Sequence, residues 1–407
     1  MNKIHCKRKV KCLISAILLL QFSFNVLAHD DKTAPALIIR AGAIFDGTTF
    51  IEGEHDVLIQ KGKIAQIGPI NTIKKDDVRV VKIPGGTILP GFIDMHTHHL
   101  LNKVPPLRML EHGVTTARDL GSPEPITGAV IDKKPYQLRQ YFSGPILQAP
   151  GGYPNVAFSG SGVEVSGDSI VRAKVDALAT QGASVIAVSI DDGLETGAPW
   201  HWHNPSTPPP WPTLSDADLL SIVDQAHKKG LKVTAYFGND AGAQRALAAS
   251  VDEWAHMPCE LLTGSVIAEA GIKQIAIDTT IDTFVECPGV HENAHHLAAA
   301  GARLFYGTDM GHLDIPHSID SNEIHMLLRT GFQNGLDYGQ SLTKALITAT
   351  SAPANYLGLA PLGQIATNAP ADIVVINGDV RASFKELEYP RLVIKNGYVV
   401  INRIAGE

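Results

Sequence analysis

Two histidines and one aspartate stand where they could hold a metal ion. His96 and His98 close the apolar run that begins at Gly91, and they lie two positions apart. Side chains two apart in a β-strand point to the same face, so both imidazoles can reach one cation. Asp309 closes a second apolar run, from Leu304, and supplies the third ligand of a catalytic zinc site. Three protein ligands leave a position for water, so the pattern predicts metal-assisted hydrolysis.

Further side chains are candidates for the same site. Asp309 is expected to orient the attacking water and to accept its proton. Tyr153 and His312 follow predicted strands and are expected to contact the substrate.

The middle of the chain is built to bring these side chains together. Strand-like runs alternate with helical ones, and the candidate strands are 91–96, 113–119, 145–149, 183–190, 231–237, 251–256, 275–286 and 303–309. This alternation predicts an α/β fold, a closed (β/α)₈ TIM barrel over residues 88–359. The site would then lie at the carboxyl ends of the strands. A doubly wound open sheet is the alternative, but no Gly-rich phosphate loop accompanies it.

Two helices carry clear boundary signals. Ser215 followed by Asp218 is a capping box, and Gly230 supplies the stop for that helix. Asp168 opens another helix, which ends at Gly182. The long segment from 193 to 213 follows the fourth predicted strand, where loops usually shape the mouth of an active site.

Short β segments occur at both ends of the chain. Residues 36–87 and residues 360–407 each contain alternating, strand-like runs separated by glycine and Asp/Asn turns. Each segment is too small to hold a core alone. We therefore expect the two ends to form one discontinuous β-sandwich domain beside the barrel.

Residues 1–28 have the composition of a cleaved secretory signal peptide. Five basic residues precede an apolar run of about 15 residues, which is short of the ~20 needed to span a bilayer. The sequence therefore predicts a periplasmic or secreted protein without a stable membrane anchor. Cleavage would leave Cys259 and Cys287, which either pair in an oxidising compartment or stay as buried thiols.

The charge balance excludes one class of partner. The formal net charge is −7, and removing the five basic residues of the N-terminal segment leaves 29 basic against 41 acidic side chains. No basic stripe remains, so nucleic acid is not an expected partner. A small-molecule substrate is expected, and the sequence leaves a homo-oligomer open.

The motifs also resemble a known superfamily. The chain is similar to the amidohydrolases, in the branch with imidazolonepropionase-like and Xaa-Pro dipeptidase-like members. The matching motifs are residues 91–98, 113–121, 251–256, 307–309 and 371–375. The resemblance covers nearly all of the chain after the N-terminal segment. It implies a barrel with a small domain, a divalent metal, and hydrolysis of an amide or related C–N bond in a cyclic amide or a dipeptide.

Two positions depart from that branch. Ala187 stands where the fourth strand usually carries a carboxylated lysine that bridges two metals, and Tyr236 replaces the histidine that usually ends the fifth strand. Without their shared anionic ligand, two cations at close range would repel each other, because their positive charges would be poorly compensated. We therefore expect one ion, zinc, held by His96, His98 and Asp309 with His256 nearby. Asp191 and Asp192 could partly replace the missing bridge, although two acids that open a loop are also typical of a helix cap or a turn.

The resemblance also implies roles for two further side chains. His256, which matches the histidine of the sixth strand, would either complete the ligand set or hydrogen-bond the developing oxyanion. Tyr236 has three interpretations: a phenolate ligand, a hydrogen-bond donor to the substrate, or a phenol that fills space.

Alternatives to the amide hydrolase follow from these departures. A chain that lacks two usual ligands is also consistent with a non-catalytic relative that binds a small molecule. A lactonase-like attack on an ester is the nearest catalytic variant.

Overall fold

The computed structural model describes residues 34–124, 134–198, 204–311 and 315–404. The proposed signal peptide and His312 lie outside these residues. No helix in the described ranges is both long and apolar enough to cross a bilayer.

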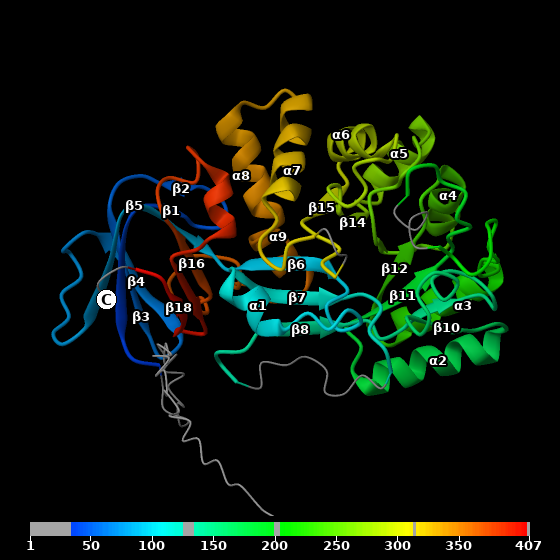
Figure 1. Cartoon of the computed structure of the whole chain (residues 1–407), viewed down its shortest axis with the longest axis horizontal. Coiled ribbons are helices and arrows are strands. Elements are labelled where there is room, and N and C mark those ends of the chain that lie inside the picture. The colour runs from blue at the N-terminus through cyan, green and yellow to red at the C-terminus, as the bar shows by residue number, and fades with distance from the viewer. Residues whose placement is uncertain (1–33, 125–133, 199–203, 312–314, 405–407) are drawn as a thin grey trace, which may run out of the picture. The chain divides into compact units, whose positions relative to one another are not determined.

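Parallel strands form the centre of the described chain. The larger parallel sheet has the strand order β10-β9-β11-β12-β13-β14-β15, and the smaller has the order β6-β7-β8 (Figure 1). Their bounds are β6 (Phe92–Thr97), β7 (Val114–Asp119), β8 (Arg139–Phe142), β9 (Ile146–Gln148), β10 (Gly162–Glu164), β11 (Val185–Ser189), β12 (Lys232–Tyr236), β13 (Glu253–Trp254), β14 (Ala276–Asp278) and β15 (Arg303–Phe305). The α/β class predicted from the sequence is confirmed.

Backbone hydrogen bonds connect the two parallel sheets at both edges of the smaller one. On one edge, the Met95 N–H donates to the Tyr306 carbonyl at 3.0 Å, and the His98 N–H donates to the Met310 carbonyl at 2.7 Å. On the other edge, the N–H of Ser184, just before β11, donates to the carbonyl of Phe142 in β8 at 2.8 Å. These bonds fit the closed barrel that the sequence predicts, and closure itself stays a prediction.

Helices separate the parallel strands along the chain. They are α1 (Pro106–Glu111), α2 (Asp168–Gln181), α3 (Asp216–Lys228), α4 (Asp240–Ala248), α5 (Gly264–Ile272), α6 (Val290–Ala300), α7 (Ser321–Gln333), α8 (Tyr338–Thr348) and α9 (Ser351–Tyr356), with a 3₁₀ turn at Phe384–Glu388. The Ser215 hydroxyl accepts from the Asp218 N–H at the start of α3, which is the N-cap half of the predicted capping box. The Asp218 carboxylate accepts from the Gly167 N–H instead of completing the box. Gly182 caps α2 in the left-handed conformation, also as predicted.

The prediction missed one strand of the structure and made another too long. The strand beside β7 is β8, whereas predicted strand 145–149 corresponds to β9, which pairs with β10 and β11 in the larger sheet. Predicted strand 275–286 ends at Asp278, where β14 stops. Soon after, Thr280 has a φ of +43°, which a β-branched residue in a continuing strand does not adopt. The chain therefore turns there, although residues 281–285 are rich in strand formers.

A mixed sheet joins the two ends of the described chain. Its order is β18-β17-β16-β5-β1-β3-β4, with β2 paired to β1. The bounds are β1 (Leu37–Phe45), β2 (Phe50–Ile51), β3 (His55–Gln60), β4 (Lys63–Pro69), β5 (Arg79–Pro90), β16 (Ile373–Ile376), β17 (Leu392–Lys395) and β18 (Tyr398–Asn402). The sequence predicted a sandwich, but these strands form one hydrogen-bonded sheet. Alternating residues of β1 and β3 enter separate apolar clusters, so both faces of the sheet are covered.

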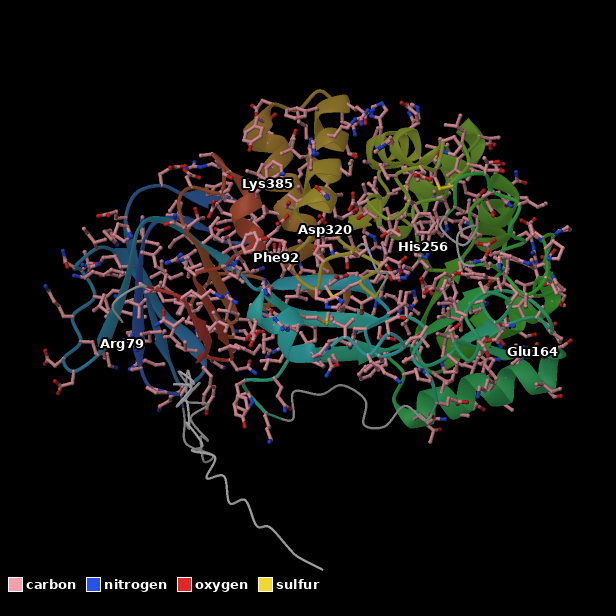
Figure 2. The ribbon with its side chains drawn as sticks, viewed as in Figure 1. Arg79, Phe92, Glu164, His256, Asp320 and Lys385 are labelled. Carbon is pink, nitrogen blue, oxygen red and sulfur yellow. A yellow bond between two sulfur atoms is a disulfide. The ribbon has the colours of Figure 1, made fainter. Side chains whose placement is uncertain are left out.

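Cys259 and Cys287 form a disulfide across 28 residues, drawn as a yellow bond in Figure 2. Of the two outcomes that the sequence left open, the structure has the paired one. Both cysteines are buried. The bond connects the segment after β13 to the segment after β14, and both segments carry side chains of the site described next.

Candidate active site

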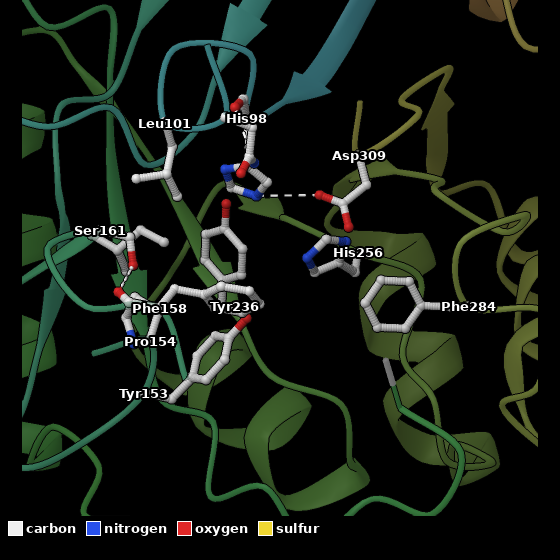
Figure 3. A pocket seen from close by; sticks show the side chains of 12 residues that line it. His98, Leu101, Tyr153, Pro154, Phe158, Ser161, Tyr236, His256, Phe284 and Asp309 are labelled. Atoms are coloured by element: carbon white, nitrogen blue, oxygen red, sulfur yellow. Dashed lines mark hydrogen bonds and ion pairs between the residues drawn. The ribbon is translucent and has the colours of Figure 1, made fainter. Parts of the chain in front are cut away.

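His96, His98 and Asp309 converge as the sequence predicts. The Nε2 atoms of the two histidines are 3.2 Å apart. The Asp309 Oδ1 atom lies 3.3 Å from the His96 Nε2 atom and 3.2 Å from the His98 Nε2 atom. His96 and Asp309 are buried, while the His98 side chain is 14% exposed. Figure 3 shows the His98 ring facing the Asp309 carboxylate across the top of a pocket.

This triangle of donor atoms fits a divalent cation. Ligand atoms of a tetrahedral zinc site, at ~2.0–2.1 Å from the metal, lie ~3.3 Å from one another. The carbonyl of Ala255 lies 2.6 Å from the His96 Nδ1 atom and can only accept, so the proton of this imidazole sits on Nδ1. The Nε2 lone pair therefore points into the triangle. Burial also lowers the pKa of His96, which favours the neutral imidazole that a metal binds.

The segment that carries Asp309 packs tightly against the strand that carries His96. A Cβ atom at Gly307 would lie 2.9 Å from the Cβ of His96, so only glycine allows the approach. Asp309 has a φ of +59°, and its N–H donates to the His96 carbonyl at 2.9 Å. Asp309 thus adopts a left-handed conformation. This conformation costs free energy and persists only because the surrounding structure imposes it. Such strain is concentrated at functional sites.

Asp94 ties the two strands together behind the ligands. Its carboxylate accepts from the Thr308 hydroxyl at 2.6 Å and from the His96 N–H at 3.1 Å. Burial raises the pKa of Asp94 to about 7, although these hydrogen bonds oppose the shift. The first-strand motif therefore holds a structural acid between its glycine and its histidines.

A buried ionic cluster lies behind His96. The Arg118 guanidinium donates to the Met95 carbonyl at 2.8 Å, to Asp278 at 2.8 Å and to Glu253 at 3.1 Å. The Asp278 Oδ2 atom is 3.8 Å from the His96 Nδ1 atom. Sequence reasoning missed this cluster, although Arg118 and Glu253 stand inside two of the recognised motifs. Their burial was the property that spacing alone did not reveal.

His256 lies beside the triangle without joining it. Its ring stacks on the His96 ring with centroids 4.3 Å apart, and its Nδ1 atom is 2.9 Å from the Thr280 hydroxyl. Among the described residues, the ligand atoms at this point that all lie within 4.8 Å of one another belong to His96, His98 and Asp309. As it stands, the geometry gives His256 a place on the wall of the site.

The Tyr236 hydroxyl also lies close to the triangle. It donates to the Leu120 carbonyl at 2.7 Å and lies 3.3 Å from the His96 Nε2 atom. The pKa of this phenol is raised well above its ordinary value, mainly by burial and next by the negative charge of Asp309. Because the hydroxyl donates its proton to the Leu120 carbonyl, the geometry favours the neutral phenol over the phenolate among the three interpretations of Tyr236. Ala187, at the usual lysine position, is buried in an apolar cluster.

A pocket lies against the triangle, and its empty space, counted together with the solvent at its open side, is about 490 Å³. His98, Tyr236, His256 and Asp309 form its polar end (Figure 3). Tyr153, a predicted substrate contact, lines the pocket as well. No spacing in the sequence marks the residues of the remaining walls, which are Leu101, Asn102, Ile146, Pro154, Phe158, Ser161 and Phe284.

A model of one protein family matches residues 87–400, which is more than half of the chain, and its description is the amidohydrolase family. The chain belongs to the amidohydrolase family. It is therefore a hydrolase of the class that acts on carbon–nitrogen bonds, as expected from its motifs. Members of this family usually bind divalent metals, and the triangle offers this amidohydrolase a ligand set for one.

Individual relatives match this amidohydrolase to different extents. Dihydroorotase of Syntrophus aciditrophicus is 34% identical over 62 residues, which are 15% of each chain. Adenine deaminase 2 of Rhizobium etli is 25% identical over 394 residues, covering 89% of this chain and 56% of that protein. A solved Xaa-Pro dipeptidase with methionine bound in its active site has a TM-score of 0.69 at 18% identity, covering 89% of this chain and 99% of that chain. At 18% sequence identity, this likeness shows a shared fold alone.

The acids that follow β11 in this amidohydrolase form a group of their own. Oxygen atoms of Asp191, Asp192 and Glu195 lie within 4.8 Å of one another, separate from the His96 group. Burial raises the pKa of Asp191 to about 7 and that of Glu195 to about 9. Because this group is separate from the triangle of His96, His98 and Asp309, the ligand geometry does not favour Asp191 as the replacement for the missing lysine.

Proposed function

We propose that this chain hydrolyses an amide or related C–N bond with the help of one divalent cation, zinc, held by His96, His98 and Asp309. The observation that carries the proposal is the triangle of two Nε2 atoms and one carboxylate oxygen, with sides of 3.2 to 3.3 Å. Such a set leaves a coordination position for water. The proposal includes a closed barrel, with the triangle at the carboxyl ends of its first and last strands.

The reaction adds one water to the substrate. The oxygen of water attacks the carbonyl carbon, the C–N bond breaks, the acyl part leaves as a carboxylic acid, and the nitrogen takes a proton. When bound, the cation would lower the pKa of water and polarise the carbonyl. A cyclic amide would open by the same step, and a dipeptide would yield two amino acids.

The residues around the cation have separate roles in this proposal. Asp309 orients the attacking water, accepts its proton and delivers it to the leaving nitrogen. His256 hydrogen-bonds the oxyanion that develops on the carbonyl, with its ring held by Thr280 and by stacking on His96. Tyr236 donates to Leu120, so it packs beneath the site and keeps the His96 ring in place.

Hydrolysis of a panel of anilides, cyclic amides and dipeptides by the zinc-loaded chain tests the proposal. We expect turnover that chelation abolishes and zinc restores. His96→Ala should remove it, whereas His296→Ala, on the exposed face of α6, should not. An inactive chain that binds these compounds would instead favour the non-catalytic binding protein.

We also propose that the protein is exported to the periplasm or secreted. The disulfide between Cys259 and Cys287 supports this, because disulfides persist in oxidising compartments. The basic and apolar composition of residues 1–28 agrees with it. Fractionation of cells that express the full chain tests the proposal: the mature protein should appear outside the cytoplasm and lack residues 1–28. Retention of uncleaved chain in the cytoplasm would contradict it.

A further inference from the structure

The walls of the pocket away from the triangle are mostly apolar and aromatic, and Asn102 and Ser161 are their polar members. Tyr153 stacks on Trp211 with centroids 5.6 Å apart and an interplanar angle of 16°, and Phe158 meets the edge of Tyr153 at 6.2 Å. Phe284 packs on the His256 ring at 4.4 Å. Figure 3 shows the Tyr153 and Phe158 rings on one side of the space below His98 and Asp309, and the Phe284 ring on the other. Because neighbouring rings hold each other, they present fixed surfaces to a bound ring.

Away from the cation proposed for the triangle, the described walls of the pocket offer no positively charged partner. None of the described residues that line it is a lysine or an arginine. The acidic side chain among them is Asp309, which lies at the triangle. A substrate carboxylate placed among these walls would lose its water without gaining a cationic partner, which is strongly unfavourable.

We infer that the pocket selects uncharged amides with an aromatic group next to the scissile bond, and that it rejects substrates with a free carboxylate. This inference rests on the proposed function, because it places the scissile carbonyl at the triangle. The aromatic group then lies between the Tyr153 and Phe284 walls. Simple dipeptides are excluded by their C-terminal carboxylate, so neutral aryl amides are the expected class.

A pair of substrates of equal size separates charge from shape. N-acetyl-4-aminobenzamide and N-acetyl-4-aminobenzoate differ only in a carboxamide against a carboxylate on the ring. We expect the zinc-loaded chain to hydrolyse the carboxamide with a kcat/KM at least ~10-fold higher, the order of effect that one unpaired charge produces. Equal rates, or a preference for the carboxylate, would overturn the inference while leaving the hydrolase proposal in place.

A variant of the pocket wall provides a second test. Leu101 lines the pocket and can carry a long cation, so Leu101→Arg should reduce the preference for the carboxamide or invert it. Leu101→Met keeps the wall neutral and should leave the preference unchanged. If both variants behave like the wild type, the absence of a cation does not set the preference and the inference fails.

Binding to the chelated chain separates this inference from the proposed function. Without metal, a carboxylate probe has no cation to coordinate, so calorimetry of the same two compounds reports on the pocket walls alone. We expect the carboxamide to bind and the carboxylate to bind at least ~10-fold more weakly. This result together with no hydrolysis would overturn the hydrolase proposal and keep the substrate class. Absence of binding by both compounds would overturn the substrate class.

Discussion

At the scale of single residues, the metal triangle depends on neighbouring groups that point its ligand atoms toward one another. Ala255 fixes the tautomer of His96, and the packed Gly307 brings the Asp309 carboxylate within reach. Tyr236 stands where the resemblance leads one to expect another ligand, yet its hydroxyl is used by the Leu120 carbonyl. This difference is testable.

Tyr236→Phe should leave the metal content unchanged and lower the free energy of unfolding by about 1–2 kcal/mol. The cost arises because the buried Leu120 carbonyl loses its hydrogen bond. Metal analysis and urea denaturation of the purified variant measure both quantities. Loss of the metal would instead identify the phenol as a ligand.

His96, His98 and Asp309 were predictable because each closes an apolar run at the end of a strand, where side chains of a parallel sheet converge. Thr280 and Phe284 were not predictable. They lie beyond β14, in a segment whose strand-like composition hides a turn, and no spacing marks them. Burial, which raises the pKa of Glu195, is likewise a property of the folded chain rather than of spacing.

At the scale of elements, the segment after β11 carries buried acids that link stability to pH. The pKa of Glu195 is raised from 4.5 to about 9. Between these values the folded chain holds a proton that the unfolded chain releases, so the free energy of unfolding falls as pH rises. Glu195→Gln removes this ionisation.

We therefore expect the melting temperature of Glu195→Gln to exceed that of the wild type increasingly between pH about 4.5 and pH about 9. Thermal melts across this range measure the difference. Glu269→Gln, an exposed change on α5, should follow the wild-type curve. A difference in melting temperature between Glu195→Gln and the wild type that stays constant with pH would show that Glu195 is ionised in the folded chain.

The disulfide holds the two segments that carry His256 and Phe284. Cys259→Ser combined with Cys287→Ser should lower the free energy of unfolding by about 3 kcal/mol, the value expected for a closed loop of this length. Denaturant titration measures the loss. A reductant should destabilise the wild type by a similar amount and leave the double variant unchanged; equal stability of both proteins would argue that the bond does not form.

Sequence patterns were informative about elements with clear ends. Ser215 and Gly182 bounded their helices correctly because capping is a local interaction. The strand beside β7, β8, was missed, since Arg139–Phe142 is too short and polar to stand out beside the apolar run that follows it. Which short run pairs with which neighbour is decided by tertiary contacts, which periodicity does not encode.

At the scale of the whole molecule, a buried ion pair joins the parallel strands to the mixed sheet. Arg139 in β8 donates to Asp372, just before β16, at 2.7 Å, and the Asp372 carboxylate also accepts from the Asn396 N–H at 2.7 Å. Lys395, buried as well, lies 3.5 Å from the same carboxylate. Asp372 therefore compensates two buried cations.

Asp372→Ala should lower the free energy of unfolding by about 3–5 kcal/mol, because two cations stay buried without this carboxylate. Asp379→Ala, which removes a partly exposed ion pair with Arg381, should cost much less. Urea titrations of both variants give the comparison. Similar losses in the two would mean that Asp372 is hydrated rather than buried.

The central claim is that one divalent cation sits among His96, His98 and Asp309. Metal analysis of the purified chain, after supply of zinc at neutral pH and removal of the excess, tests it most directly. The account predicts close to one equivalent in the wild type and in His296→Ala, and none in His98→Ala. No bound metal in the wild type, or two equivalents, would contradict it.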